Sequence, residues 1–131
     1  MLAFNYNGVT LAYIGDAVIE LAVREALITS GITDTGRLSA AAQKLVCAKT
    51  QSDAVEKLLP ILTPQEEAAY KLGRNHRVSG KPKHASVSEY SRATGLEAIF
   101  GYLRLTGDGE RISELIKMAY GDTLDEIKNQ I

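Results

Sequence analysis

Two acidic residues stand out because each lies within an apolar stretch that has the pattern of a helix. Asp16 lies in LAYIGDAVIEL (residues 11–21), and Glu97 lies in TGLEAIF (residues 94–100). A carboxylate beside a core is costly unless it is paired, hydrogen-bonded or bound to a metal. Facing carboxylates on two helices suit a hard cation such as Mg²⁺, which prefers oxygen ligands and often binds phosphate. A cation held beside a phosphodiester can activate water and stabilise the developing negative charge.

A structural role is the alternative for each acid taken alone, as a half-buried carboxylate paired with Arg24, Arg92 or Arg104. Two such acids on the two most apolar helices favour a functional site. Each also follows a glycine closely in the sequence, and a helical glycine costs about 1 kcal/mol relative to alanine. We therefore expect Gly15 and Gly95 to allow close approach of another backbone or of a ligand.

Other candidate groups are weaker. Glu20 lies one turn after Asp16 and would share its helix face, although a salt-bridged surface acid explains it equally well. His76 and His84 lack the spacing to a cysteine pair that a zinc site requires. Neither a serine–histidine–aspartate arrangement nor a glycine-rich phosphate loop after a strand is visible. Cys47, the single cysteine, is expected to be a small core residue in a reducing compartment.

A basic segment is the second feature that points to a function. The chain has a net charge of −1, but residues 68–88 hold five basic residues and no acid, so the remainder sums to −6. The five are Lys71, Arg74, Arg77, Lys81 and Lys83. A basic segment on an otherwise acidic domain indicates a localised anionic partner such as a phosphate backbone. The alternative is a solvated loop.

The elements that must position these residues are all predicted to be helices. Every segment of at least ten residues has helical period, and the connections are short apart from the basic loop at 74–86. The expected fold is all-α, a bundle of about six to seven helices in one domain over residues 1–131. The predicted helices cover residues 11–29, 37–48, 51–59, 64–72, 88–105 and 109–119, with one or two terminal turns in 123–131.

Local signals set the predicted helix ends and faces. Thr10 is the expected cap of the first helix, and TPQE (residues 63–66) has the pattern of a capping box with proline at the first helical position. Gly73 is expected to stop the fourth helix. The buried stripe of the first helix is predicted to be Leu11, Ile14, Val18 and Leu21. Apolar surface beyond that stripe in residues 11–23 is compatible with an interface.

Composition indicates an ordinary soluble globular protein, with 45% hydrophobic and 24% charged residues. No apolar run is long enough to span a membrane, and no secretory signal precedes the first helix. A cytoplasmic protein without a membrane partner is therefore expected.

Two segments resemble one enzyme family. YIGDAVIEL (residues 13–21) resembles the signature helix of the ribonuclease III family, and GLEAIFGYL (residues 95–103) resembles its second acidic helix. LGRN (residues 72–75) before a basic loop is similar to the mini-ribonuclease III class, which has no double-stranded-RNA-binding domain. The resemblance covers essentially the whole chain. It implies an all-α endoribonuclease domain that works as a homodimer on double-stranded RNA with Mg²⁺, for which Mn²⁺ can substitute.

The resemblance also assigns roles to residues. Asp16 and Glu97 match the family's metal-binding catalytic pair. Full-length ribonuclease III carries two further acids, one turn before each, at positions that are Ala12 and Thr94 here. Water and RNA phosphates are then expected to complete the metal coordination, with Glu20 and Thr94 as candidate polar groups around the ligands.

Duplex binding must then come from the catalytic dimer and its basic loop. A-form RNA is recognised mainly by shape and by its phosphates and 2′-hydroxyls. The expected RNA-binding residues are Arg74, Asn75, Arg77, Lys81, Lys83 and His84. The class implies precursor large-subunit (23S) ribosomal RNA as substrate, 5′-phosphate and 3′-hydroxyl products, and a ribosomal protein as a further partner.

Two other functions remain open from the sequence. A non-catalytic RNA-binding or ribosome-assembly protein would retain the fold, but it would have no reason to retain both acids. A helical nucleotide pyrophosphohydrolase also uses helix-borne carboxylates, in clusters such as Glu-x-x-Glu. Glu66 with Glu67, and Glu110 with Glu114, fit that spacing poorly.

Overall fold

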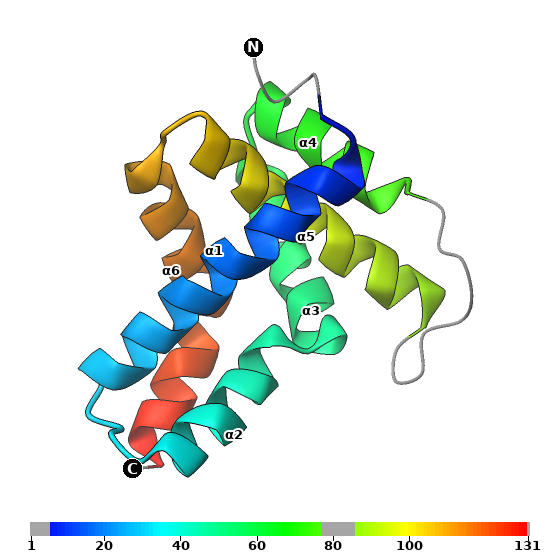
Figure 1. The fold of residues 1–131 in the computed structure, drawn as a ribbon. Coiled ribbons are helices and arrows are strands. Elements are labelled where there is room, and N and C mark those ends of the chain that lie inside the picture. Colours follow the sequence, from blue (N-terminus) through cyan, green and yellow to red (C-terminus); the bar gives the residue numbers. More distant parts are fainter. Residues whose placement is uncertain (1–5, 77–85, 131) are drawn as a thin grey trace.

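The described part of the chain, residues 6–76 and 86–130 of a computed structural model, folds into six α-helices and one 3₁₀ turn without any β-strand. This confirms the predicted all-α class. The helices are arranged as a bundle in which α1 crosses α5 (Figure 1). In chain order the elements are α1 (Gly8–Thr29), α2 (Thr35–Val46), α3 (Ala48–Leu58), η2 (Leu59–Ile61), α4 (Pro64–Arg74), α5 (Val87–Leu105) and α6 (Gly109–Asn129).

Helices α1 and α5 touch through their backbones, because glycine occupies both sides of the crossing. A Cβ atom on Gly15 would lie 1.6 Å from the carbonyl oxygen of Glu97. A Cβ atom on Gly101 would lie 1.9 Å from the carbonyl oxygen of Leu11. No side chain fits either position, so the predicted close approach at Gly15 is confirmed, and the partner is a backbone. This crossing brings the helix turn that carries Asp16 against the turn that carries Glu97.

Helix α4 packs on α5 through a second pair of glycines. A Cβ atom on Gly95 would lie 2.7 Å from the ring of Tyr70, and one on Gly73 would lie 2.6 Å from the carbonyl oxygen of Thr94. Gly73 was predicted to stop the helix, but α4 continues through it to Arg74. That prediction was wrong because the glycine serves the packing of two helices and not a turn.

The buried face of α1 also differs from the predicted stripe. The buried aliphatic residues that line it are Leu11, Ile19, Val23 and Leu27, and Leu21 is 61% exposed. The glycine contact with α5 explains the difference, because Gly15 must face inward. The residues spaced four positions apart along the same helix face are then buried with it. Residues on the opposite face of α1 are left in solvent.

Several helix ends lie away from their predicted positions. Asn7, not Thr10, caps α1, and its Oδ1 accepts a hydrogen bond of 2.8 Å from the Thr10 backbone nitrogen. Helix α2 begins at Thr35 behind Asp34, whose carboxylate accepts from the Arg37 nitrogen. The terminal turns predicted after residue 119 are the continuation of α6, because Tyr120 and Ile127 carry its buried face past Gly121.

Cys47 is exposed, so the prediction of a core residue was wrong. It lies between α2 and α3, where the extended backbone takes the chain out of the helical pattern. Its Sγ atom lies 3.2 Å from the hydroxyl of Thr50.

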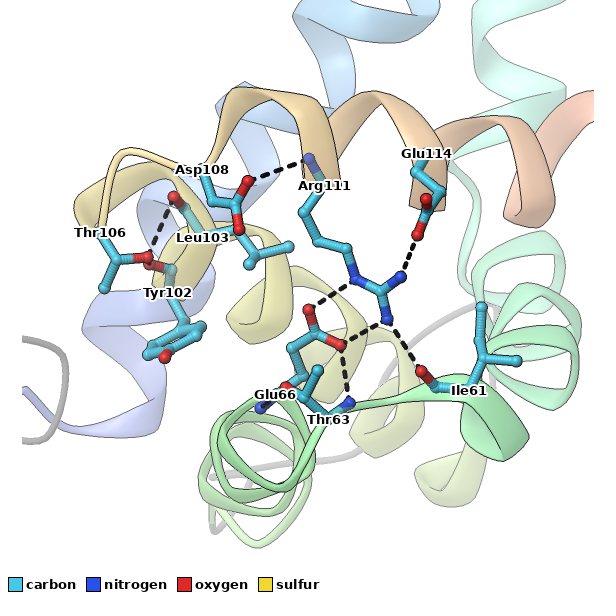
Figure 2. A network of polar contacts seen from close by, with 9 residues as sticks. All are labelled: Ile61, Thr63, Glu66, Tyr102, Leu103, Thr106, Asp108, Arg111 and Glu114. Atoms are coloured by element: carbon cyan, nitrogen blue, oxygen red, sulfur yellow. Dashed lines mark hydrogen bonds and ion pairs between the residues drawn. The ribbon is translucent and has the colours of Figure 1, made fainter.

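A buried ion pair joins the start of α4 to the start of α6 (Figure 2). Arg111 donates to both carboxylate oxygens of Glu66, at 2.8 Å from Nε and 2.9 Å from Nη2. Nη2 also donates to the carbonyl oxygen of Ile61 at 2.8 Å. Glu66 in turn accepts from the Thr63 nitrogen at 2.9 Å, which completes the predicted capping box. We call this group the Glu66–Arg111 clamp.

None of the helices described for this chain is both long enough and apolar enough to cross a membrane.

Candidate functional site

The fold places Asp16 and Glu97 side by side, although they lie far apart in the sequence. Asp16 is an exposed residue of α1, and Glu97 is a half-buried residue of α5. Burial, first, and the neighbouring Asp16 carboxylate, second, together raise the pKa of the Glu97 carboxyl to about 8. Two neighbouring carboxyl groups resist ionising together, because their negative charges repel. In the protein alone, Glu97 therefore holds a proton at neutral pH.

Basic partners do not account for this acid pair. Of the three arginines considered as partners from the sequence, Arg24 pairs with Glu20 at 3.0 Å and Arg92 pairs with Glu56. Arg104 is exposed and forms no salt bridge with a described residue. Among residues 6–76 and 86–130, neither Asp16 nor Glu97 takes part in a salt bridge. The structural alternative, an acid neutralised by an arginine of the bundle, thus does not describe this site.

The donor set of the pair fits a hard divalent cation. Two carboxyl groups from two rigid helices supply oxygen ligands, and Mg²⁺ commonly takes one or two carboxylates while keeping several waters. A cation would also replace the proton that Glu97 holds and relieve the repulsion between the acids. Within the described residues no group of three or more potential ligand residues gathers around a metal position. The remaining coordination would come from water and substrate.

The two positions at which the resemblance implies further acids supply no carboxylate here. Ala12 is buried in α1. Thr94 is also buried, and its hydroxyl donates to the carbonyl oxygen of Tyr90 at 2.9 Å. Glu20 is engaged with Arg24 one turn further along α1. Supporting roles for Glu20 and Thr94 therefore stay predictions.

The described residues of the basic segment lie at the end of α4. Arg74 and Asn75 are exposed, and Arg74 Nε donates to Asn75 Oδ1 at 3.1 Å. The Arg74 guanidinium also lies over the ring of Tyr70, 5.5 Å from its centroid. These contacts hold a charged side chain in place at a surface. The other predicted RNA-binding residues, Arg77, Lys81, Lys83 and His84, lie outside the described residues.

Two residues near the acid pair were missed by sequence reasoning. Tyr120 of α6 is fully buried. Burial is the main cause that raises the pKa of its phenol, and the charge of Glu97 is the second. Gln51 of α3 is also buried and lies beside the phenol. Nothing local in the sequence signals that α3 and α6 converge under Glu97.

Comparison with known proteins gives a consistent result. The sequence model of the Ribonuclease III domain matches residues 9–108. The chain is 43% identical over 110 residues to the Mini-ribonuclease 3 of Symbiobacterium thermophilum, covering 84% of this chain and 85% of that protein. It is 42% identical over 112 residues to the Mini-ribonuclease 3 of Enterococcus faecalis, covering 84% and 85%.

A solved structure shares the fold. The crystal structure of a protein from Fusobacterium nucleatum superimposes with a TM-score of 0.82 at 30% sequence identity, covering 90% of this chain and 94% of that one. The residues matched by the Ribonuclease III domain model, 9–108, include both Asp16 and Glu97. The chain therefore belongs to the ribonuclease III family, as an endoribonuclease of its mini-ribonuclease III class.

Proposed function

We propose that this endoribonuclease cleaves double-stranded RNA as a homodimer and that Asp16 and Glu97 of each subunit hold the divalent cation it needs. Mg²⁺ is the proposed ion, with Mn²⁺ as a substitute. The observation that carries the proposal is the acid pair itself: two adjacent carboxyl groups, one with its pKa raised to about 8, and no basic partner among the described residues. Residues 1–131 would form one catalytic domain.

The chain's own residues contribute orientation and charge to the reaction. The glycine crossing holds the two carboxyl groups near each other, because the backbones of α1 and α5 approach closely at Gly15 and Gly101. Glu97 must give up its proton to become a ligand, and Asp16, at the exposed edge, faces the solvent from which RNA arrives. When bound, the cation would lower the pKa of a water and offset negative charge at phosphorus. Breaking the P–O3′ bond by hydrolysis leaves 5′-phosphate and 3′-hydroxyl ends.

The catalytic role is tested by cleavage of a labelled RNA duplex in Mg²⁺. We expect Asp16→Asn and Glu97→Gln each to lower the rate by at least about 100-fold, because loss of a partner that only orients a ligand already costs about 10- to 100-fold. Glu110→Gln, which removes an exposed acid at the start of α6, is the matched control and should cut at the wild-type rate. Wild-type rates for both site variants would overturn the proposal.

The exposed face of α1 supports the homodimer. Tyr13 is 84% exposed, Leu21 61% and Ile28 54%, all on the helix that carries Asp16. Apolar side chains aligned on one helix face are typical of a protein–protein interface. A two-fold interface here would bring the same helix of both subunits together.

The dimer is tested by sedimentation of a charged variant. Leu21→Glu should shift the protein toward monomer, because a carboxylate would be buried without a partner in the interface. Met118→Glu is the control, since Met118 is an exposed apolar residue of α6, 44% accessible. If Leu21→Glu stays dimeric at the wild-type concentration dependence, the α1 face is not the interface.

The charged end of α4 supports a contact with the RNA backbone. Arg74 is exposed and held in place by Asn75 and Tyr70, so it loses little conformational freedom on binding. Arg74→Gln should flatten the dependence of log K on log salt by about 0.7 to 0.9. Lys49→Gln, which removes a lysine paired with Asp53, should leave the slope unchanged. An unchanged slope in Arg74→Gln would remove Arg74 from the interface.

The finer substrate assignment rests on the resemblance of residues 72–75 to the mini class. We infer that the natural duplex is precursor 23S ribosomal RNA, that the enzyme acts in the cytoplasm, and that a ribosomal protein is a further partner. Mapping of the 23S ends in cells that lack this chain is the test, and mature ends in those cells would contradict it.

A further inference from the structure

An ion pair lies in the middle of the exposed apolar face of α1. Tyr13, Leu21 and Ile28 are the large apolar side chains exposed on this face. Between the first and the last of them, Arg24 Nη2 donates to Glu20 Oε2 at 3.0 Å. Residues three and four positions apart share one helix face, so the steps 13, 17, 20, 24 and 28 place the pair in line with Tyr13 and Ile28. Interface cores are depleted of charge, so a charged pair at this place needs an explanation.

A hollow beside the pair extends the same surface onto α2. Its volume is about 360 Å³, and both Glu20 and Arg24 line it. The apolar residues that line it come from both helices and are Leu27, Ile28, Leu38, Ala42 and Val46. The pair therefore lies between an exposed apolar helix face and a concave apolar surface. A partner that covers this surface would also cover both charges, and covered charges need partners of opposite sign.

The order of the two charges fits a second copy of the chain. In a two-fold contact, residue i meets residue j of the partner subunit, and j meets i. If two α1 helices cross antiparallel, Glu20 of one helix meets Arg24 of the other, twice in each dimer. A parallel crossing would set Glu20 against Glu20, and like charges placed together across an interface are costly. One acid and one base four residues apart thus make a helix face that complements its own antiparallel copy.

We propose that Glu20 and Arg24 of both subunits form a ring of four charges across the two-fold axis of the homodimer. In this ring each Arg24 binds Glu20 of its own helix and Glu20 of the partner subunit. The ring rests on the homodimer through α1 argued above. An arginine has five N–H donors and a carboxylate accepts several hydrogen bonds, so each residue can serve two partners. The ring compensates the charges that the interface covers and fixes the antiparallel orientation of the helices.

The alternative is an ordinary surface ion pair within one helix, which contributes little to stability. Lys49 and Asp53 of α3 are such a pair at the same spacing. Their Nζ and Oδ2 atoms lie 3.7 Å apart, and the two side chains are 75% and 69% exposed. The glutamate of the α1 pair is less accessible, with 36% of its side chain exposed. Lys49 and Asp53 therefore serve as the matched control.

The test is sedimentation equilibrium of full chains with reversed charges. Glu20→Arg makes all four charges of the ring positive, and Arg24→Glu makes all four negative. Each variant alone should raise the dimer dissociation constant at least about 100-fold, because like charges meet across the axis. An equimolar mixture should form a heterodimer with a dissociation constant within about 10-fold of the wild-type value. Wild-type values for both single variants would overturn the ring, and so would two weakened variants that gain nothing on mixing.

Mixing separates a contact between subunits from a contact within a helix. In the mixed dimer each α1 helix still carries two like charges four residues apart, so an interaction within the helix is not repaired. The control is a mixture of Lys49→Glu with Asp53→Lys, which changes net charge by the same amounts. These two variants should dimerise as wild type does, both alone and mixed. A gain on mixing of equal size in the control would contradict the ring, because net charge alone would then explain the heterodimer.

Leu21→Glu distinguishes failure of the ring from failure of the dimer. If wild type is a monomer, or if Leu21→Glu stays dimeric, the homodimer through α1 is wrong and the ring falls with it. If wild type is a dimer and Leu21→Glu is not, but Glu20→Arg and Arg24→Glu keep the wild-type dissociation constant, the interface stands. In that case only the ring is wrong.

Discussion

Two buried acids of this fold behave in opposite ways. Glu66 is only 2% exposed, and although burial pushes its pKa up, hydrogen bonds from Arg111 and Thr63 outweigh burial and hold the pKa below its ordinary value. Glu97 is less buried, yet burial and Asp16 raise its pKa to about 8. The deeper carboxyl is the stronger acid.

The difference shows that the neighbours of a buried carboxyl, more than its depth, decide its role. Glu66 has its counter-charge within the chain, two helices away in sequence and in direct contact (Figure 2). Glu97 faces a second acid, and no described residue supplies positive charge. The clamp has its counter-charge within the fold, whereas we propose that the acid pair takes its counter-charge from a cation outside the chain.

The largest expected effect is the loss of the clamp's cation. Arg111→Ala should lower the free energy of unfolding by about 3 to 5 kcal/mol, because it leaves Glu66 buried and unpaired. Arg104→Ala, which removes an exposed arginine at the end of α5, should change it by less than about 0.5 kcal/mol. Urea denaturation measures both. A small effect of Arg111→Ala would mean that the clamp is not what holds α4 to α6.

Binding of a cation to the acid pair should change the free energy of unfolding by less than loss of the clamp does. At a free Mg²⁺ concentration of about 100 times the dissociation constant, wild type should gain about 2.7 kcal/mol of stability. Glu97→Gln should gain almost none, and Glu66→Gln should gain as much as wild type despite its lower starting stability. Equal Mg²⁺ stabilisation of wild type and Glu97→Gln would place the ion elsewhere.

The two acids should also give opposite pH dependences in the metal-free protein. Between pH 4.5 and about 8 the unfolded chain releases the Glu97 proton and the folded chain keeps it, so stability falls as pH rises. The slope from this one group is at most about 1.4 kcal/mol per pH unit. Glu66 has a lowered pKa, so its contribution is present above pH 4.5 and is lost as pH falls.

Denaturation across this pH range, with and without one substitution, checks the signs. Glu97→Gln should remove the fall between pH 4.5 and 8 and leave the acid limb in place. If the wild-type stability does not fall over that range relative to Glu97→Gln, the raised pKa of Glu97 is wrong.

The sequence predicted the fold class and the capping box of α4 and singled out Asp16 and Glu97, because these depend on local period and on residue type. Gly15 was predicted to allow close approach, and it does. The helix end predicted at Gly73 was wrong, because the sequence around a glycine inside a helix does not differ from that around one that ends it until the partner helix is known. The predicted burial of Leu21 was wrong for a related reason, since an exposed apolar helix face has the same period as a buried one.

The buried end of the site was beyond sequence reasoning. Tyr120 and Gln51 are distant in the chain and have ordinary helical neighbours, and their proximity to Glu97 depends on how three helices pack. Arg111 had no sequence signal as the partner of Glu66 for the same reason. Tertiary contacts between helices decide these roles.

Proton release on metal binding is a direct test of a cation site at Asp16 and Glu97. Glu97 is mostly protonated at pH 7 with a pKa of about 8, so binding a cation to the acid pair must displace that proton. Calorimetry of Mg²⁺ binding in buffers of different ionisation enthalpy counts the protons released. We expect close to one proton per ion for wild type at pH 7 and no binding at this site by Glu97→Gln. Mg²⁺ binding without proton release, or with equal release in Glu97→Gln, would contradict it.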